Sequence, residues 1–178
     1  MSALPYSEIP SAPVAYTPAT VLSRTMDGLG FRYHWATEGL TPDALDYRPE
    51  PTCRSVRETL SHIRNLVDMI EDSIGGRVYV LPEPEHSDYV TTRRDTLEVI
   101  QRVSKALNAA EPGALEGWHI RFKMGEHDLE FPFWYSINGP IADAMYHLGQ
   151  VVALRRAAGL PIPDGVNPFM GTRAEPPA

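Results

Sequence analysis

The sequence predicts an all-α protein: an up-down four-helix bundle with a short β-hairpin before the last helix. The first observation behind this prediction is the placement of the 17 prolines, which leave five long proline-free windows. Because proline breaks helix interiors, such windows are where helices can form. The second observation is that four of the five windows place apolar residues at helical spacing, whereas the remaining one alternates polar and apolar residues. The length of 178 residues suits a single domain, 1–178, with a substantial core.

The first helix is predicted over residues 18–39. Thr17 and Pro18 mark its start, because proline is tolerated in the first turn of a helix. Gly39 and the Thr41-Pro42 pair end it. Between these limits the apolar residues recur at alternating spacings of four and three, the pattern of a bundle seam: Leu22, Met26, Leu29, Tyr33, Ala36 and Leu40.

The second and third helices are predicted over residues 56–74 and 88–110. The second begins after Ser55, which can form a capping box with Glu58, and Gly75-Gly76 ends it. The residues that it turns towards the core are Val56, Leu60, Ile63, Val67 and Ile70. The corresponding residues of the third helix are Leu97, Ile100, Val103 and Leu107.

A hairpin and a last helix are predicted for the remaining chain. Residues 118–122 and 128–133 alternate polar and apolar side chains around a short polar connection, which is typical of a β-hairpin. Asn138 and Pro140 provide a cap and a first-turn proline for a last helix over residues 140–158. Residues 160–178 contain five prolines and are expected to form an irregular tail.

The composition argues against several classes of function. The formal net charge is −7, whereas nucleic acids and anionic membrane surfaces attract clustered basic residues. No run of about 18 apolar residues occurs, so no segment is expected to span a membrane. Cys53 is the only cysteine, which rules out an internal disulfide and a cysteine-based zinc site. The first basic residue is Arg24, so no secretory signal is expected and a cytoplasmic location is favoured.

The most informative segment is the part of the last predicted helix at residues 141–154. Its only strongly polar side chains are Asp143, His147 and Gln150, and at about 100° per residue these fall within one sector of roughly 60°. Asp143 and His147 are one turn apart on the same face. A helix that is apolar nearly all round is normally buried, and a buried carboxylate and imidazole need a partner. A metal ion is one partner that satisfies both.

The second predicted helix supplies a further candidate ligand. His62 is the one titratable residue on its apolar side, where it lies between Leu66 and Met69. Facing helices of a bundle build metal sites from inward side chains in this way. Two imidazoles and one carboxylate, here His62, Asp143 and His147, are a common catalytic set that leaves a fourth position for water or substrate. Gln150 is expected to orient a ligand or to hold the bound water.

Simpler interpretations remain for each residue. His62 alone can be a hydrogen-bonded core histidine, and Asp143 alone can be a first-turn acid favoured by the helix dipole. Asp143 and His147 together can form a buried ion pair without a metal.

Other polar and aromatic residues receive mainly structural interpretations. His34 is expected at the surface, paired with Glu38 one turn later. Arg155 and Arg156 are expected to form the solvated end of the last helix, with contact to an anionic substrate as the alternative. Trp134 belongs to an aromatic cluster expected in the core, and it is a candidate for the wall of a pocket.

Two segments of the chain resemble the signatures of the DinB-like family of metal-binding four-helix bundles. Residues 44–49 (ALDYRP), followed by residues 55–63 (SVRETLSHI), look like the first signature. Residues 146–152 (YHLGQVV) look like the second, together with Arg155, Arg156, Gly159, Pro161 and Pro163. The two motifs occur in the expected order and on the expected helices, and the resemblance covers nearly the whole chain.

The resemblance implies a fold, a metal and a chemistry. Members of the family are up-down bundles, often dimers, that hold a divalent metal ion, usually zinc or nickel. One histidine of the second helix and two residues of the fourth bind the ion, and in this chain these positions are His62, Asp143 and His147. Many members have histidine in place of Asp143, and the mycothiol-dependent branch has glutamate there. Some relatives use low-molecular-weight thiols, such as mycothiol or bacillithiol, as co-substrates.

We therefore expect a divalent-metal-dependent enzyme of the DinB-like type, a thiol-dependent S-transferase that activates a small thiol and acts on a small-molecule substrate. A divalent ion lowers the pKa of a bound thiol or water and so generates a nucleophile near neutral pH. One alternative is a metal-dependent hydrolase, which activates water. The other is a non-catalytic metal-binding bundle with a vestigial site.

The apolar character of the last predicted helix also bears on partners. A helix that is apolar nearly all round needs cover on several sides. A second copy of the chain in a homodimer is one such cover, and the hairpin or the tail is another.

Overall fold

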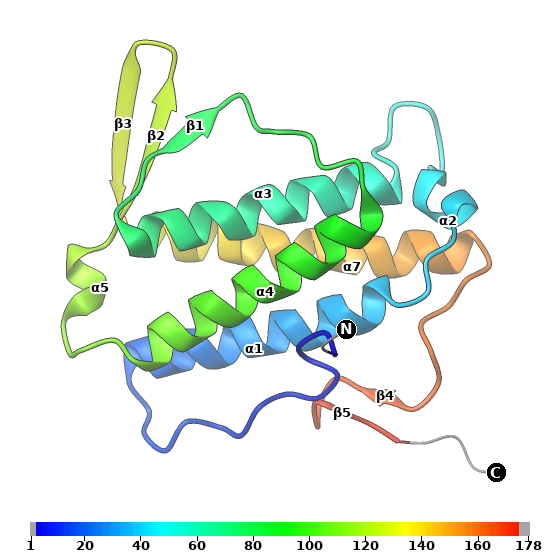
Figure 1. The fold of residues 1–178 in the computed structure, drawn as a ribbon, viewed down its shortest axis with the longest axis horizontal. Coiled ribbons are helices and arrows are strands. Elements are labelled where there is room, and N and C mark those ends of the chain that lie inside the picture. Colours follow the sequence, from blue (N-terminus) through cyan, green and yellow to red (C-terminus); the bar gives the residue numbers. More distant parts are fainter. Residues whose placement is uncertain (1–2, 175–178) are drawn as a thin grey trace.

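The computed structural model describes residues 3–174. The chain is mostly helical, and four long helices pack together (Figure 1): α1 (Pro18–Thr37), α3 (Val56–Gly75), α4 (Tyr89–Asn108) and α7 (Ala142–Ala157). α1 and α3 each pack against both α4 and α7, so α1 and α3 lie at opposite corners of the arrangement. The limits of α1, α3 and α4 lie within two residues of the predicted ranges.

The predicted up-down order is wrong from the third long helix onwards, because α4 runs in the same direction as α3 and α7 then runs in the same direction as α1 (Figure 1). In Figure 1, α1 and α7 run from left to right, whereas α3 and α4 both run from right to left. The connection over residues 76–88 allows this, because it can span about 40 Å when extended. A helix of the length of α3 is only about 30 Å long. The chain therefore returns along the whole molecule before α4 begins.

The helix ends follow capping signals in the sequence. Thr17 and Ser55 each form a capping box at the start of a long helix, and Gly76 ends α3 in the left-handed conformation (φ +68°). Two short helices were not predicted: α2 (Pro42–Asp46) and α5 (Ala114–Gly117). Each is about one turn long, so neither contains the apolar repeat on which a helix prediction depends.

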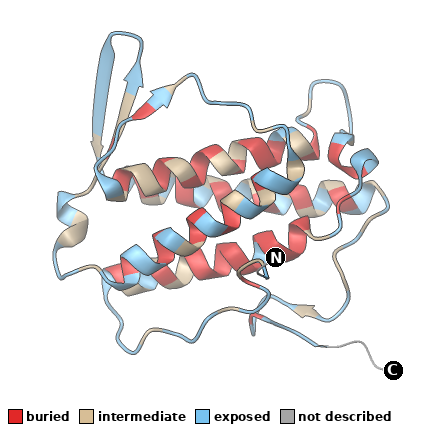
Figure 2. Cartoon of the chain, in the orientation of Figure 1, coloured by how far each residue is buried: buried red, intermediate tan, exposed pale blue. Residues whose placement is uncertain are grey.

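The main core lies between the four long helices. It is built from the predicted seams, and its most deeply buried side chains include Met26, Leu29, Tyr33, Leu60, Ile63, Val67, Leu97, Ile100 and Leu148. Figure 2 shows that α1 is buried over most of its length. An N-terminal segment covers α1: a β-carbon at Gly30 would lie 2.5 Å from the Tyr6 ring, and the Tyr6 hydroxyl donates to Asp27 at 3.1 Å.

Two residues expected at the surface are buried instead. His34 is 8% exposed, its Nδ1 lies 2.8 Å from the carbonyl oxygen of Pro5, and Glu38 pairs with Arg93 rather than with His34. Arg155 is 1% exposed and donates to five carbonyl oxygens, those of Trp35, Ala36, Glu38, Leu160 and Pro161. Helical spacing could not reveal this burial, because the covering groups come from other segments of the chain.

A small sheet accompanies the helices, so the all-α prediction is incomplete. The predicted hairpin is present as β2 (His119–Met124) and β3 (His127–Pro132), which pair antiparallel. β1 (Tyr79–Leu81) pairs in parallel with β2 and was not predicted, because three residues are too few to show an alternating pattern. The tail contains two further short strands, β4 (Val166–Asn167) and β5 (Thr172–Arg173). The last residues of the predicted irregular tail, 175–178, lie outside the described residues.

The last helical run begins earlier than predicted. α6 (Trp134–Ser136) and the π-helical segment η1 (Ile137–Ile141) lead directly into α7. Asn138 and Pro140, which were interpreted as a start signal, lie inside η1. Proline has no N–H to donate, and the wider π-helical turn accommodates it without ending the helical run.

The outer side of α7 is exposed, contrary to the prediction of burial nearly all round. Its buried residues lie on one side only: Ala144, Leu148, Val151 and Arg155. Tyr146 on the other side is 65% exposed. This helix therefore carries apolar residues on its exposed side, where they do not contribute to the core of the chain.

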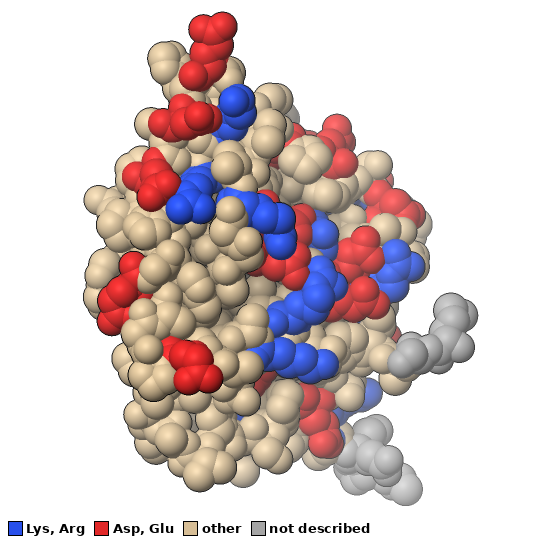
Figure 3. Space-filling model, turned by 60° about the vertical axis from the view of Figure 1, so that its left-hand side comes forward, with Lys and Arg blue, Asp and Glu red and all other residues tan. Residues whose placement is uncertain are grey.

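Two observations concern surfaces that could meet a membrane or a nucleic acid. No helix among residues 3–174 combines the length and the apolar character needed to cross a bilayer. On the face drawn in Figure 3, Lys and Arg lie next to Asp and Glu. Ion pairs of the protein include Arg77 with Asp72 (2.6 Å), Arg102 with Glu71 (2.7 Å) and Arg121 with Glu130 (2.7 Å). Acidic side chains therefore lie among the basic ones on this face (Figure 3).

Candidate metal centre

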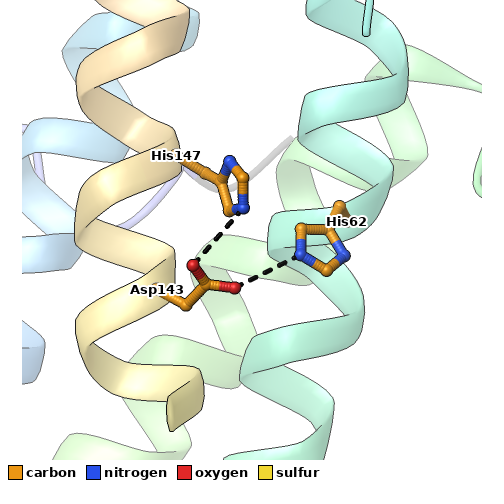
Figure 4. A group of neighbouring side chains, drawn as sticks. All are labelled: His62, Asp143 and His147. Carbon is orange, nitrogen blue, oxygen red and sulfur yellow. Dashed lines mark ion pairs between the residues drawn. The ribbon is translucent and has the colours of Figure 1, made fainter. Parts of the chain in front are cut away.

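His62 of α3 and Asp143 and His147 of α7 lie close together (Figure 4). One carboxylate oxygen of Asp143 lies 3.4 Å from His62 Nε2, and the other lies 3.4 Å from His147 Nε2. One donor atom of each residue can be chosen so that all three lie within 4.8 Å of one another. The structure thus brings together the three residues that the sequence indicated as metal ligands.

The antiparallel packing of α3 against α7 creates this cluster. Near the other end of the same contact, the hydroxyls of Ser73 and Ser136 are 3.2 Å apart. His62 is eleven residues before Ser73, and His147 is eleven residues after Ser136. Eleven residues are about three helical turns. The two histidines therefore lie at about the same distance along their helices from the serine pair, and they meet. Asp143 joins them because it is one turn before His147 on the same face.

The two contacts of Asp143 are as long as the separations between ligands of a metal ion. Charge-assisted N–H···O hydrogen bonds are about 2.7–2.9 Å long, and both contacts of Asp143 are longer, at 3.4 Å. Zinc binds imidazole nitrogen and carboxylate oxygen at about 2.0–2.2 Å, so two ligands of a tetrahedral ion lie roughly 3.3–3.5 Å apart. Imidazole and carboxylate together are also suitable donors for zinc and nickel. The residues present therefore fit a divalent cation of this kind.

The second nitrogen of each imidazole is held from outside the cluster. His147 Nδ1 lies 2.8 Å from Gln150 Oε1, so Gln150 contacts the histidine that it was expected to orient. His62 Nδ1 lies 3.2 Å from Glu83 Oε2. Glu83 was not anticipated, because it lies in the connection over residues 76–88 and no helical or strand repeat relates it to His62.

One side of the cluster is accessible. The side chains of His62 and His147 are 16% and 12% exposed, whereas that of Asp143 is 42% exposed. Asp143 borders a shallow pocket of about 420 Å³, which is also lined by Leu66, Asn138, Gly139, Pro140, Ala142 and Tyr146. Asp143 is the only charged residue among those that line this pocket. A cation held by the three donors would therefore adjoin a largely uncharged space of small-molecule size.

Trp134 does not line this pocket. It is 76% exposed and borders a separate cavity of about 320 Å³, together with Pro18, Leu115, Glu116, Pro132, Phe133 and Ile137. Trp134 precedes Asp143 by nine residues of a helical run, which corresponds to about 13 Å along the axis. Tyr146 is the aromatic residue beside Asp143, and its spacing of three residues could have indicated this from the sequence.

Comparisons of the chain with protein families, with curated proteins and with solved structures find no match.

Proposed function

We propose that the protein is a divalent-metal-dependent enzyme of the DinB-like type, in which His62, Asp143 and His147 bind a zinc or nickel ion. The observation that carries this proposal is the meeting of three donors within 4.8 Å of one another, with each histidine Nε2 3.4 Å from a carboxylate oxygen of Asp143. The resemblance of residues 44–49, 55–63 and 146–152 to the DinB-like signatures supports it. The four long helices agree with the number of helices that this resemblance implies, although their directions do not alternate as in an up-down bundle (Figure 1).

We propose further that the reaction is the transfer of a small thiol to an electrophilic small molecule. The resemblance to a family with thiol-dependent members favours this reaction over hydrolysis. When bound, the ion lowers the pKa of a thiol so that thiolate is available near neutral pH. In the overall reaction the S–H bond and the bond from carbon to the leaving group break, and a carbon–sulfur bond forms. The leaving group departs with its electron pair, and the thiol proton passes to solvent.

The residues around the centre have separate roles in this proposal. Gln150 Oε1 contacts Nδ1 of the His147 ring, and this contact fixes the direction of Nε2. Leu66, Pro140 and Tyr146 give the pocket beside Asp143 apolar walls, which suit an uncharged electrophile and reduce the access of water.

We also propose that the protein is a cytoplasmic homodimer. Gly149 and Ala153 of α7 are both exposed and lie one turn apart, beyond the part of the helix whose residues Ala142 and Tyr146 line the pocket beside Asp143. This spacing places them on one side of the helix, and their exposure means that neither the hairpin nor the described part of the tail covers them. A second copy of the chain can cover this side.

Elemental analysis tests the metal centre. Wild-type protein, His147→Ala and His127→Ala are produced in medium that contains zinc and nickel. His127 is an exposed residue of the hairpin and serves as the matched control. We expect about one ion per chain in the wild type and in His127→Ala, and loss of most of the metal in His147→Ala. Wild-type protein without metal, or His147→Ala with as much metal as the wild type, would contradict the proposal.

An assay with a reactive alkyl halide, with and without a small thiol, tests the reaction. We expect turnover by the metal-loaded protein to require the thiol and to fall by at least about tenfold in His147→Ala. Turnover that is unchanged by thiol would indicate a hydrolase. Metal binding without turnover in either condition would indicate a non-catalytic bundle.

A further inference from the structure

The connection over residues 76–88 places a second carboxylate on His62, on the side of the ring that faces away from Asp143. We propose that Glu83 is a positioning residue for the metal centre: it accepts the Nδ1–H of His62 and so directs the unprotonated Nε2 towards Asp143. This inference rests on the proposed metal centre and deepens it, because it identifies what selects the nitrogen that binds the ion.

The hydrogen-bond partners of the His62 ring indicate which of its nitrogens carries the proton. An ionised carboxylate can only accept a hydrogen bond. Glu83 Oε2 forms a hydrogen bond with His62 Nδ1 at 3.2 Å, so Nδ1 carries the proton. A neutral imidazole has only one ring proton, which leaves Nε2 with the lone pair that a metal ion requires. This nitrogen is the one that lies 3.4 Å from Asp143.

Glu83 does not depend on His62 for its own position. Asn65 donates from Nδ2 to Glu83 Oε2 (3.3 Å) and to the carbonyl oxygen of Pro84 (2.9 Å). Asn65 Oδ1 lies 2.9 Å from His86 Nε2, and the backbone N–H of His86 donates to Ser61 Oγ at 2.9 Å. Ser61 and Asn65 thus anchor the segment directly after Glu83, at Pro84 and His86. Replacement of the Glu83 side chain should therefore leave the segment in place and remove only the contacts of its carboxylate with His62 and Asn65.

The two histidines of the centre are held by different kinds of acceptor. His147 contacts the neutral amide of Gln150, whereas His62 contacts the carboxylate of Glu83. A carboxylate acceptor makes the imidazole that it holds a better metal ligand, and loss of such a group weakens metal binding by about 10- to 100-fold. The Glu83 side chain is 32% exposed, so solvent screens part of its charge. We therefore expect an effect near the lower end of this range.

Zinc affinity, measured by competition with a chromophoric chelator, tests the proposal. Wild-type protein is compared with Glu83→Ala, Glu83→Gln and Glu85→Ala. Glu85 has the same charge, is exposed and lies two residues along the same segment, so it is the matched control. We expect Glu83→Ala to weaken zinc binding by about tenfold, and Glu83→Gln by less because the amide oxygen still accepts the Nδ1–H.

Glu85→Ala should remain within about twofold of the wild type, because isolated surface charges contribute little. Equal zinc affinities of Glu83→Ala and Glu85→Ala would overturn the positioning role.

A second measurement needs no metal and separates this proposal from the metal centre itself. Nitrogen-15 NMR of metal-free protein, recorded over a series of pH values, identifies which ring nitrogen of His62 carries the proton in the spectra that show a single protonated nitrogen. We expect the Nδ1–H form in the wild type and in Glu85→Ala, and a shift towards the Nε2–H form in Glu83→Ala. The Nε2–H form in the wild type would overturn the role of Glu83 even if zinc binds. The Nδ1–H form in a protein that binds no zinc would support the role of Glu83 and reject the metal centre.

Discussion

Several buried polar residues of this protein are held by partners far away in the sequence. Asp27 accepts hydrogen bonds from Tyr6 (3.1 Å) and Ser104 (2.6 Å). His34 lies under the N-terminal segment, where its Nδ1 contacts the carbonyl oxygen of Pro5 at 2.8 Å. Burial lowers the pKa of His34, and the hydrogen bond to Pro5 opposes this effect only in part. The fold therefore accommodates the neutral ring better than the charged one.

Acid should weaken the fold through His34. Its pKa in the folded protein lies below the ordinary value of 6.5, so on acidification the unfolded chain takes up this proton first. The stability that the neutral ring contributes is present above pH 6.5 and is lost as the pH falls towards the folded-state pKa. Urea unfolding of metal-free wild type and His34→Gln, from about pH 8 to about pH 5, measures the effect. We expect a shallower pH dependence for the variant, and identical curves would contradict this explanation.

Among the residues of the centre, those that lie on long helices could be predicted from the sequence. Asp143, His147 and Gln150 stand out because helical spacing places them on one side of an otherwise apolar helix. His62 stands out because it is the one titratable residue on the apolar side of α3. Glu83 could not be predicted, because its place depends on the path of a connection without a repeating pattern. The burial of His34 and Arg155 was missed for a related reason: their neighbours belong to other segments.

At the scale of elements, Arg155 joins the ends of two helices. Its guanidinium donates to carbonyl oxygens at the end of α1 and just beyond the end of α7: Trp35, Ala36, Glu38, Leu160 and Pro161. Carbonyl groups at helix ends have no partner within the helix. One buried side chain at the end of α7 thus satisfies carbonyls at the end of α1 and in the segment that follows α7, and so fixes the two parallel helices side by side.

Arg155→Met and Arg156→Met form a matched pair that tests this contact. Arg155 is buried, whereas the adjacent Arg156 is exposed. Removal of the Arg155 guanidinium leaves several buried carbonyl oxygens without a donor, and we expect a loss of unfolding free energy on the order of 3 kcal/mol. Arg156→Met should change it by no more than about 0.5 kcal/mol. Guanidinium chloride unfolding measures both, and equal values for the two variants would contradict the role of Arg155.

An element is predicted more accurately from the sequence when it is long enough to show a periodic pattern of apolar residues. α1, α3 and α4 have 20 residues each, so their apolar stripes and caps identify them from the sequence. β1 has three residues and α5 has four, and no periodicity can be read over such lengths. The early start of the last helical run was hidden by Pro140, which imitates a helix start because the sequence does not show a π-helical turn.

At the scale of the whole molecule, the direction of α4 could not be predicted from local patterns in the sequence. The sequence shows a connection of 13 residues between α3 and α4, and this length permits either direction. Because the chain returns along α3 before α4 starts, the connection passes beside the metal centre. The same topology that departs from the predicted order therefore brings Glu83 to His62.

The exposed side of α7 leads to a prediction about assembly. We expect the wild type to behave in light scattering as twice its chain mass of 19.8 kDa. In a homodimer across this side of α7, Ala153→Glu would place a charge in the interface, which is unfavourable. It should therefore yield the monomer, while Ala106→Glu on the exposed side of α4 should leave the dimer intact. A monomeric wild type would contradict the proposed dimer.

The two ends of the described chain meet on α1. The N–H of Ile9 donates to the carbonyl oxygen of Gly171 at 2.8 Å, and the Arg173 guanidinium lies 4.8 Å from the centre of the Trp35 ring. α1 occupies the corner opposite α3, which carries His62. A fusion partner joined directly to residue 3 or to residue 174 would thus emerge on the α1 side, and protein immobilised through it would keep the approach to Asp143 free for small molecules.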